Sequence, residues 1–499
     1  MDYLDSQKRR AHKIRLMIGY GLMSVAIGLA TIILVYAAYG YGINTKTGEV
    51  VQNGLLFADS RPSGAKISLN GQDKDADTAA RLVLPAGSYY LTLSKEGYRN
   101  WQRNFLLNEH SVARFAYPFL FPVAPIETAI KSYEDMPELF SQSPNLKWLL
   151  IESTAGVPAR PSFDLYDTDN LSDPPQSLTL PVGLLTGYAS SSSKFTEVEW
   201  AADNRHLLVK HTGRSGHEFI VIDRADPAQS FNVNKLFKVP ADDVALADKK
   251  IGQFYIFDKA AATLALADRQ SANLTGTVIR EVLAFKAISN NLLTYVSPAI
   301  GGNFSVRIWD NGQTYSLTSL EANSDWLLAA TTYQSHWYYM VGAKGSERLS
   351  IYKDPLSSLK DSKVAKAQPM LALQNIEANS LAVSDNGRFF GAQSGQMFLV
   401  FDVELEESYR YQLEAKLNSP MSWLDGFRWA GQAGGNLLIS DYDGSNSHLL
   451  GATASPLGYF SRDVRHLLVI RQTGSANTQT LIDIDMRAGN DLPEALRSR

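Results

Sequence analysis

The sequence contains no cysteine among its 499 residues, and this absence excludes several kinds of chemistry. Disulfide bonds, thiolate nucleophiles, iron–sulfur clusters and cysteine-based zinc sites are all ruled out. The net charge is only −4, so the chain lacks the basic surplus that is typical of nucleic-acid-binding proteins. We therefore expect a protein that is stabilised by a buried apolar core and has no nucleic-acid partner.

Sequence signatures of catalysis and nucleotide binding are also missing. There is no G-x-S-x-G nucleophile elbow, no P-loop and no G-x-G-x-x-G stretch. The segments that begin at Asp167 and Asp441 start like calcium loops, but Leu178 and Ala452 stand where such loops need a glutamate. We expect no enzyme activity, no metal and no cofactor.

Three histidines, His206, His211 and His217, lie close together along the chain. They do not form an H-E-x-x-H arrangement, and no third metal ligand is evident beside the two that flank residues 212–216. We interpret them as solvated histidines of a hairpin.

One long uncharged hydrophobic run spans residues 16–39. About 20 such residues suffice for a helix to cross a bilayer, whereas signal peptides have apolar cores of about 7–15 residues. We therefore expect a single-pass membrane anchor; the alternative is a cleaved signal peptide with a weak cleavage site at residues 35–37. Ser24 and Gly28 form a small-xxx-small pair, which is weak evidence for a homodimer through this helix.

The charges around this run indicate its orientation. Residues 1–15 form a basic segment with Lys and Arg at five positions between 8 and 15, and the first charge after the run is Lys46. The positive-inside rule then places the N-terminus in the cytoplasm and the rest of the chain outside the cell membrane.

Short strands and tight turns follow the anchor between residues 53 and 118. "SRPSGAKISLNG" gives a turn, an alternating strand and an Asn-Gly turn, and "LPAGSYYLTLSKEGYRNW" gives a strand between two further turns. These stretches resemble the PEGA domain family. The residues that match its pattern are Pro62, Gly64, Ala65, Asn70, Gly71, Gly87, Tyr89, Gly97 and Tyr98.

The resemblance implies a small, surface-exposed β-sandwich that stands beside a membrane. Ser63 replaces the acidic residue of the family name, and Ala79 stands where proline is common. We expect the matched residues to hold the fold, because glycine permits positive φ, proline fixes φ and tyrosine fills a small core.

The remainder of the chain shows a repeating pattern. Residues 119–134 are typical of a linker or strap, because three prolines lie between Tyr117 and Glu127. Between residues 135 and 490 we identify eight copies of a turn, a strand, a hairpin and a strand that ends in Asp, spaced about 45 residues apart. The best copies, such as "SDNGRFF" and "SDYDGSN", resemble TolB-like and WD40-like repeats.

The predicted fold class is therefore an all-β ectodomain behind one transmembrane helix: a PEGA-type sandwich followed by a β-propeller of about eight, or seven, blades. We expect the terminal strand at 480–486 to close the ring beside strands that begin near Glu138. Trp148, Trp200, Trp423 and Trp429 are expected between blades, and the strand-ending Asp residues are expected to cap turns.

Three functions remain open at this stage, and one of them, a structural spacer with no specific ligand, overlaps with the first of the two that follow. The absence of catalytic motifs favours a binding or scaffold protein that recognises an envelope protein or a cell-surface glycan. The alternative is a hydrolase of glycans or peptides that acts at the propeller funnel. An acidic cluster with raised pKa values at the funnel would favour the enzyme, and an open apolar patch would favour the binder.

Overall fold

The computed structural model describes residues 6–38, 41–43, 50–153, 160–189, 192–321, 325–361, 364, 366–474 and 478–493. Tyr39 and residues 1–5, which belong to the predicted anchor and basic segment, lie outside the described residues. The chain divides into two compact units, the first made of Met1–Ala124 and Arg487–Arg499 and the second of Pro125–Met486.

The first unit begins with the helix α1 (Ser6–Ala38). Its segment His12–Tyr36 is long and apolar enough to cross a membrane, and none of it is buried against other parts of the protein. A helix that is apolar all round normally lies inside a core or a bilayer. By length and composition, α1 is therefore a candidate membrane span or signal sequence.

Two four-stranded sheets complete the first unit. One contains β1 (Tyr41–Ile43), β2 (Val50–Ala58), β5 (Ala80–Pro85) and β8 (Val112–Phe115). The other has the order β4 (Gln72–Asp77), β3 (Lys66–Leu69), β6 (Gly87–Ser94) and β7 (Trp101–Leu107). Alternating residues such as Leu56, Ile67, Leu91 and Trp101 face one another in a common core, which makes the unit a β-sandwich.

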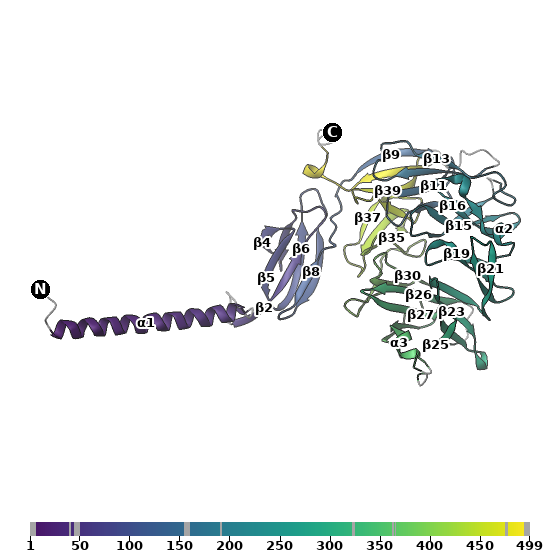
Figure 1. The fold of residues 1–499 in the computed structure, drawn as a ribbon. Coiled ribbons are helices and arrows are strands. Elements are labelled where there is room, and N and C mark those ends of the chain that lie inside the picture. The colour runs from purple at the N-terminus through teal and green to yellow at the C-terminus, as the bar shows by residue number, and fades with distance from the viewer. Residues whose placement is uncertain are drawn as a thin grey trace. The chain divides into compact units, whose positions relative to one another are not determined.

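The second unit consists of eight four-stranded antiparallel sheets in chain order (Figure 1). The first contains β10 (Phe140–Gln142), β11 (Trp148–Ser153), β12 (Ser162–Asp167) and β13 (Gln176–Thr179). The second contains β14 (Lys194–Trp200), β15 (His206–Gly213), β16 (Gly216–Asp223) and β17 (Phe231–Asn232), and is followed by α2 (Val233–Phe237). The third contains β18 (Asp243–Ala247), β19 (Lys250–Asp258), β20 (Thr263–Asp268) and β21 (Asn273–Arg280).

The next three sheets repeat this arrangement. The fourth contains β22 (Ala284–Ser289), β23 (Leu292–Pro298), β24 (Phe304–Asp310) and β25 (Gln313–Leu320). The fifth contains β26 (Trp326–Tyr333), β27 (His336–Ala343), β28 (Arg348–Lys353) and β29 (Leu371–Gln374), with α3 (Pro355–Leu359) between the last two. The sixth contains β30 (Ser380–Val383), β31 (Phe389–Ser394), β32 (Met397–Asp402) and β33 (Glu407–Gln412).

The last two sheets close the ring. The seventh contains β34 (Ser422–Trp423), β35 (Arg428–Ala433), β36 (Asn436–Asp441) and β37 (His448–Ala452). The eighth contains β38 (Gly458–Phe460), β39 (His466–Gln472), β40 (Gln479–Asp485) and β9 (Ile126–Tyr133). Its fourth strand thus comes from the start of the unit, so the architecture is a β-propeller of eight blades, as predicted.

The closing strand differs from the prediction in two ways. The terminal strand β40 pairs with β9 and not with strands that begin near Glu138. In addition, β9 lies in the range 119–134 that was predicted to be a linker. The prolines that suggested a linker all precede residue 126, so the stretch from Ile126 to Tyr133 is free to donate and accept ladder hydrogen bonds.

The closing seam is held by buried apolar side chains from both ends of the unit. Tyr133 and Phe140 from its start pack with Leu468 and Leu481 from its end. Gln142 Nε2 also donates to the carbonyl oxygen of Phe460 at 2.7 Å. The ring therefore has no free blade edge at this seam.

Candidate functional site in the propeller channel

The first strand of each blade lies at its inner end. Contacts join consecutive inner strands from β14 through β18, β22, β26 and β30 to β34, so these strands lie around the axis of the propeller, and we call the space along this axis the channel. The charged residues of these strands, and of the turns that follow β18, β30 and β34, include Glu197, Glu199, Asp243, Lys249, Lys286, Asp385 and Asp425. The channel therefore gathers carboxylates from blades that are far apart in the sequence.

Glu197 and Glu199 lie on either side of a β-bulge in β14. Glu197 is exposed to solvent, yet the surrounding protein raises its pKa by desolvation, an effect that a hydrogen bond with Ser141 opposes. Ser141 is itself fully buried and accepts a hydrogen bond from Trp200 Nε1 at 2.8 Å. β-Bulges often change the direction of side chains beside functional sites, and this bulge lies between two glutamates.

Glu199 reaches toward the neighbouring blade. Its Oε1 accepts a hydrogen bond from the backbone N–H of Leu246 on β18 at 2.6 Å. Desolvation raises the pKa of Glu199, the charges of Lys286 and Lys249 lower it, and that of Asp243 raises it. The carboxyl of Glu199 thus interacts with acidic and basic groups of the third and fourth blades.

Asp385 is another carboxyl of the channel whose pKa is raised. Desolvation and the negative charge of Asp425 raise its pKa to about 6, although Lys249 acts in the opposite direction. Tyr459 on β38 donates to the carbonyl oxygen of Phe140 at 2.9 Å. Burial, and then the charges of Glu197 and Asp385, raise the pKa of this tyrosine, so the three residues share one electrostatic environment.

The chemistry available in the channel follows from these groups. The five carboxylates in this set outnumber its two lysines, so these residues together carry net negative charge once the carboxyls are ionised. Among the residues that the structure describes, no group of three or more His, Asp or Glu is placed to hold a metal ion. The channel can bind a cation or a ligand rich in hydrogen-bond donors, and Asp385 can exchange a proton near neutral pH.

A second polar cluster lies inside the second blade and has the connectivity of a catalytic triad. Ser193 Oγ lies 2.9 Å from His211 Nε2, and His211 Nδ1 lies 3.0 Å from Glu218 Oε1. Glu218 also accepts hydrogen bonds from the Thr186 backbone N–H at 2.7 Å and from Asn232 Nδ2 at 2.6 Å.

Burial decides what this cluster does. The exposed fractions of Ser193, His211 and Glu218 are only 6%, 1% and 7%, so a substrate cannot approach the hydroxyl. Burial raises the pKa of Glu218, but the hydrogen bonds to His211 and its other partners lower it to about 2. The cluster therefore stabilises the blade and ties the segment before β14 to it.

The prediction of solvated hairpin histidines is correct for one of the three and wrong for two. His217 is exposed, whereas His206 and His211 are buried. His211 shares the strand face of Leu207 and Val209, so the alternation of β15 could have revealed its burial. The hydrogen-bond partners of His206 and His211 could not be found this way, because these partners lie outside β15.

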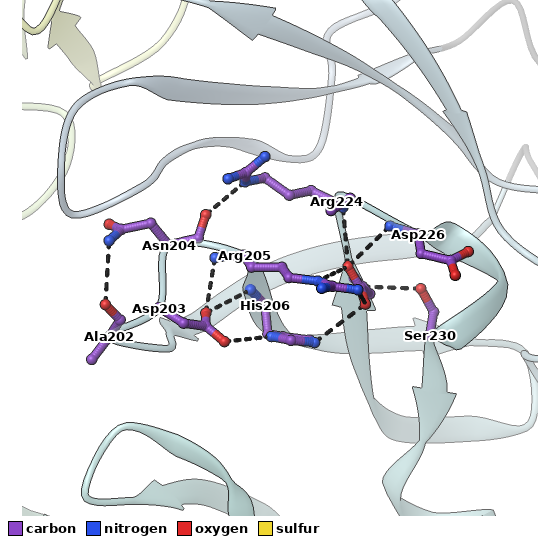
Figure 2. Close-up of polar contacts among 10 residues, drawn as sticks. Ala202, Asp203, Asn204, Arg205, His206, Arg224, Asp226 and Ser230 are labelled. Atoms are coloured by element: carbon purple, nitrogen blue, oxygen red, sulfur yellow. Dashed lines mark hydrogen bonds and ion pairs between the residues drawn. The ribbon is translucent and has the colours of Figure 1, made fainter.

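An ion pair links the turn before β15 to the end of β16 (Figure 2). Arg205 binds Asp223 with two hydrogen bonds of 2.7 and 2.6 Å. His206 lies between Asp203 and Asp223, at 2.6 and 3.3 Å. Asp223 also accepts backbone N–H groups from the following turn, and its own N–H donates to Ser230 Oγ.

The sixth blade repeats this arrangement with Arg388 and Asp402, which is fully buried. The first, sixth and eighth blades share a serine before the corresponding turn, because Ser143, Ser384 and Ser461 each accept the backbone N–H of the residue five positions later. Asp223 and Asp402, which end strands of the second and sixth blades, accept backbone N–H groups of the turns that follow them. These strand-ending Asp residues therefore cap turns, as predicted.

The four tryptophans pack in the core of the propeller, and the calcium-like loop at Asp441 forms a hydrogen-bonded turn. Trp200 and Trp429 are buried in clusters that join adjacent blades, and Trp148 and Trp423 are half-buried against the same clusters. In the turn after Asp441, Asn446 donates to its carboxylate at 2.9 Å.

The first signature turn of the sandwich is held by Thr78. The backbone N–H of Gly64, whose φ is +74°, donates to the carbonyl oxygen of Thr78 at 2.7 Å. Ala65 is fully buried, and its N–H donates to Thr78 Oγ1 at 2.9 Å. The carbonyl oxygen of Pro62 accepts a hydrogen bond from Ser60 Oγ. These contacts explain the glycine and the small alanine by backbone geometry and close packing.

Asn70 and Gly71 form the tight turn between β3 and β4, with φ values of 52° and 76°. Asn70 Oδ1 accepts a hydrogen bond from the backbone N–H of Tyr90 on β6, the strand that pairs with β3, at 2.7 Å. Tyr89 donates to the carbonyl oxygen of Pro85 and stacks on Phe105. Gly87 differs from the expectation of a left-handed turn, since its φ of 158° is close to extended.

Gly97 and Tyr98 hold the C-terminal segment of the first unit. Tyr98 Oη accepts the backbone N–H of Ala488 at 2.7 Å, and a Cβ on Gly97 would lie 3.1 Å from the Ala488 side chain. Lys95 lies 3.7 Å from Asp491. Beside this segment the surface forms a groove of about 730 Å³, which Gly64 and Gly97 also line. The sequence offered no signal that the end of the chain would return here.

Comparison with known protein families finds one match, in the sandwich. The PEGA domain profile matches residues 53–119. No curated protein matches the sequence significantly. Solved structures that align with the chain include BamB from Moraxella catarrhalis, with 11% identity, 72% of this chain and 100% of that chain covered, and a TM-score of 0.42.

Two other solved structures align to a similar extent. The computationally designed Ika8 protein has 11% identity, covers 72% of this chain and 98% of its own, and has a TM-score of 0.41. An oligogalacturonate lyase in complex with manganese has 9% identity, 74% and 98% coverage, and a TM-score of 0.40. Likeness at this level identifies no function.

Proposed function

We propose that this chain is a membrane-anchored, extracytoplasmic binding protein whose propeller channel binds a cationic ligand. The observation that carries the proposal is the convergence of Glu197, Glu199, Asp243 and Asp385 on one channel, with raised pKa values. Carboxylates in such a setting are held at an electrostatic cost. A positively charged group of an envelope protein or an amino sugar relieves that cost on binding.

The proposal predicts a specific pH dependence. The pKa of free Asp385 is about 6, and a bound cation would lower it. Binding then favours the ionised carboxylate, so affinity should rise as the pH increases from about 5 to 7. A ligand recognised only by apolar contact would show no such rise.

Fluorescence polarisation with a labelled hexalysine peptide tests the channel directly. Asp385→Asn and Glu199→Gln should each weaken binding, whereas Glu414→Gln, at an exposed carboxylate of the sixth blade, should not. Equal affinities of all three variants would overturn the channel as the binding site. Asp385→Asn should also stabilise the propeller above pH 6, because a carboxyl with a raised pKa costs stability once it is ionised.

Anchoring and orientation are tested separately. Protease added to intact cells should digest the sandwich and propeller and leave a small N-terminal fragment that contains α1. Protection of the whole chain would contradict the orientation. An N-terminus that begins near residue 38 in the mature protein would instead show that α1 is a cleaved signal peptide.

A hydrolase is the second candidate, and one specific observation favours it. The acidic cluster with raised pKa values is the feature that was expected of the enzyme. Asp385, with a pKa of about 6 beside a second carboxyl, suits a general acid in glycoside cleavage. Turnover of glycan substrates that Asp385→Asn abolishes, without loss of ligand affinity, would establish this function in place of simple binding.

A further inference from the structure

The outer face of the sheet formed by β2, β5 and β8 carries a continuous apolar row. Leu55 pairs in register with Val83 on one side and with Val112 on the other. Val83 and Val112 are 64% and 59% exposed. Isolated exposed apolar residues are common on protein surfaces, but a row across three strands is not.

Arginines lie beside this row. In the next register position, Phe57 pairs with Arg81 and with Arg114. Phe57 is 37% exposed, and the Arg81 guanidinium lies 5.8 Å from the centre of its ring. The paired positions of β2, β5 and β8 include these two arginines and no acidic residue, and Asp59 follows at the end of β2, so the paired face is apolar with net positive charge.

The opposite sheet of the sandwich has a different outer face. Its outward positions on β6 and β7 include Ser88, Gln102 and Asn104, which are all exposed. Leu106 is 64% exposed and stands opposite Ser88, and Tyr90, which is 38% exposed, pairs with Asn104, so the apolar side chains here alternate with polar ones and form no continuous row. The asymmetry shows that the apolar face belongs to one sheet and is not a general property of the domain.

We infer that the face of Leu55, Phe57, Arg81, Val83, Val112 and Arg114 docks on a bilayer that contains anionic lipids. Valine and phenylalanine insert at the boundary of the acyl chains, and arginine binds headgroup phosphates. The anchoring of α1, which belongs to the proposed function, supplies the proximity. The candidate span ends at Tyr36 and β1, which pairs with β2, begins at Tyr41, so the connection reaches at most about 18 Å and the face stays within reach of that bilayer.

The absence of cysteine makes the test clean, because each introduced cysteine is the only one in the chain. The full chain is reconstituted in vesicles of phosphatidylcholine with phosphatidylglycerol, and a nitroxide is attached through Val83→Cys, Val112→Cys or Leu106→Cys. Leu106 is the matched control, since its exposed fraction equals that of Val83. Electron paramagnetic resonance then measures collisions of each label with oxygen and with a water-soluble nickel chelate.

Lipid contact should make the labels at Val83 and Val112 accessible to oxygen, with nickel collisions at least about threefold fewer than at Leu106. Joint replacement of Arg81 and Arg114 by glutamate should restore nickel access. Equal nickel access at all three positions would overturn the proposal. Labels shielded from both oxygen and nickel would also overturn it, because they would indicate a protein partner.

The anchor is judged by a different readout. Flotation of the unlabelled chain with the vesicles after a carbonate wash shows whether α1 holds it in the bilayer. A chain that floats while its Val83 label stays open to nickel contradicts the docking face alone. A chain that does not float contradicts the anchor on which the proposed function depends.

Discussion

Replacement of Gly387 by alanine tests how the turn after β30 packs against the preceding blade. Gly387 belongs to the repeat stretch "SDNGRFF" and has a φ of +73°. A Cβ at this position would lie 2.6 Å from the carbonyl oxygen of Thr332 and 2.6 Å from Thr331 Oγ1, both on β26. A backbone oxygen in a strand cannot move aside without disturbing the ladder.

The expected loss has two parts. Alanine at positive φ costs about 1 kcal/mol relative to glycine. The steric conflict with β26 should add about 1–3 kcal/mol, as is usual for overpacking in a well-filled interior. Gly345 provides the matched control, because its φ is also +73° but nothing lies within 4 Å of its Cβ position. Gly345→Ala should therefore show the backbone cost alone.

Urea unfolding of the full chain in mild detergent, followed by tryptophan fluorescence, measures both variants under the same conditions. Gly387→Ala should lower the free energy of unfolding by about 2–4 kcal/mol and Gly345→Ala by about 1 kcal/mol. Equal losses at the two glycines would refute the packing of this turn against the fifth blade.

Three further outcomes are expected. Leu481→Ala at the closing seam should lower the free energy of unfolding by about 3 kcal/mol, because Leu481 is fully buried. Leu317→Ala on β25, away from the seam, should cost about the same, because Leu317 is also fully buried. A loss below about 1 kcal/mol for Leu481→Ala alone, in the same unfolding assay, would mean that the blades form an open array. Glu218 has a pKa lowered to about 2, so its stabilisation is present above pH 4.5 and is lost as the pH falls toward 2. Melting temperatures of Glu218→Gln should accordingly fall less steeply across this acid range, and an unchanged slope would contradict the depressed pKa. Gly97→Ala should displace the C-terminal segment at Ala488 and speed tryptic cleavage just before it, whereas an unchanged cleavage rate would show that the contact is not needed.

The sequence by itself determined the local elements. The uncharged run predicted α1, the Asn70-Gly71 pair predicted a tight turn, and the recurrence of about 45 residues predicted eight blades. Each of these features depends on neighbours along the chain: apolar length for a helix, positive φ for a turn, and alternation for a strand. They can therefore be read without knowledge of distant contacts.

Only the tertiary structure decided which distant residues meet. β9 carries no repeat signature, and its role as the closing strand depends on β40, which lies more than three hundred residues later. Glu199 and Asp385 come from different blades, and only closure of the ring brings them to one channel. Hydrogen bonds and charge interactions act over a few ångströms in space, so a site assembled from several blades leaves no spacing in the sequence by which it could be recognised.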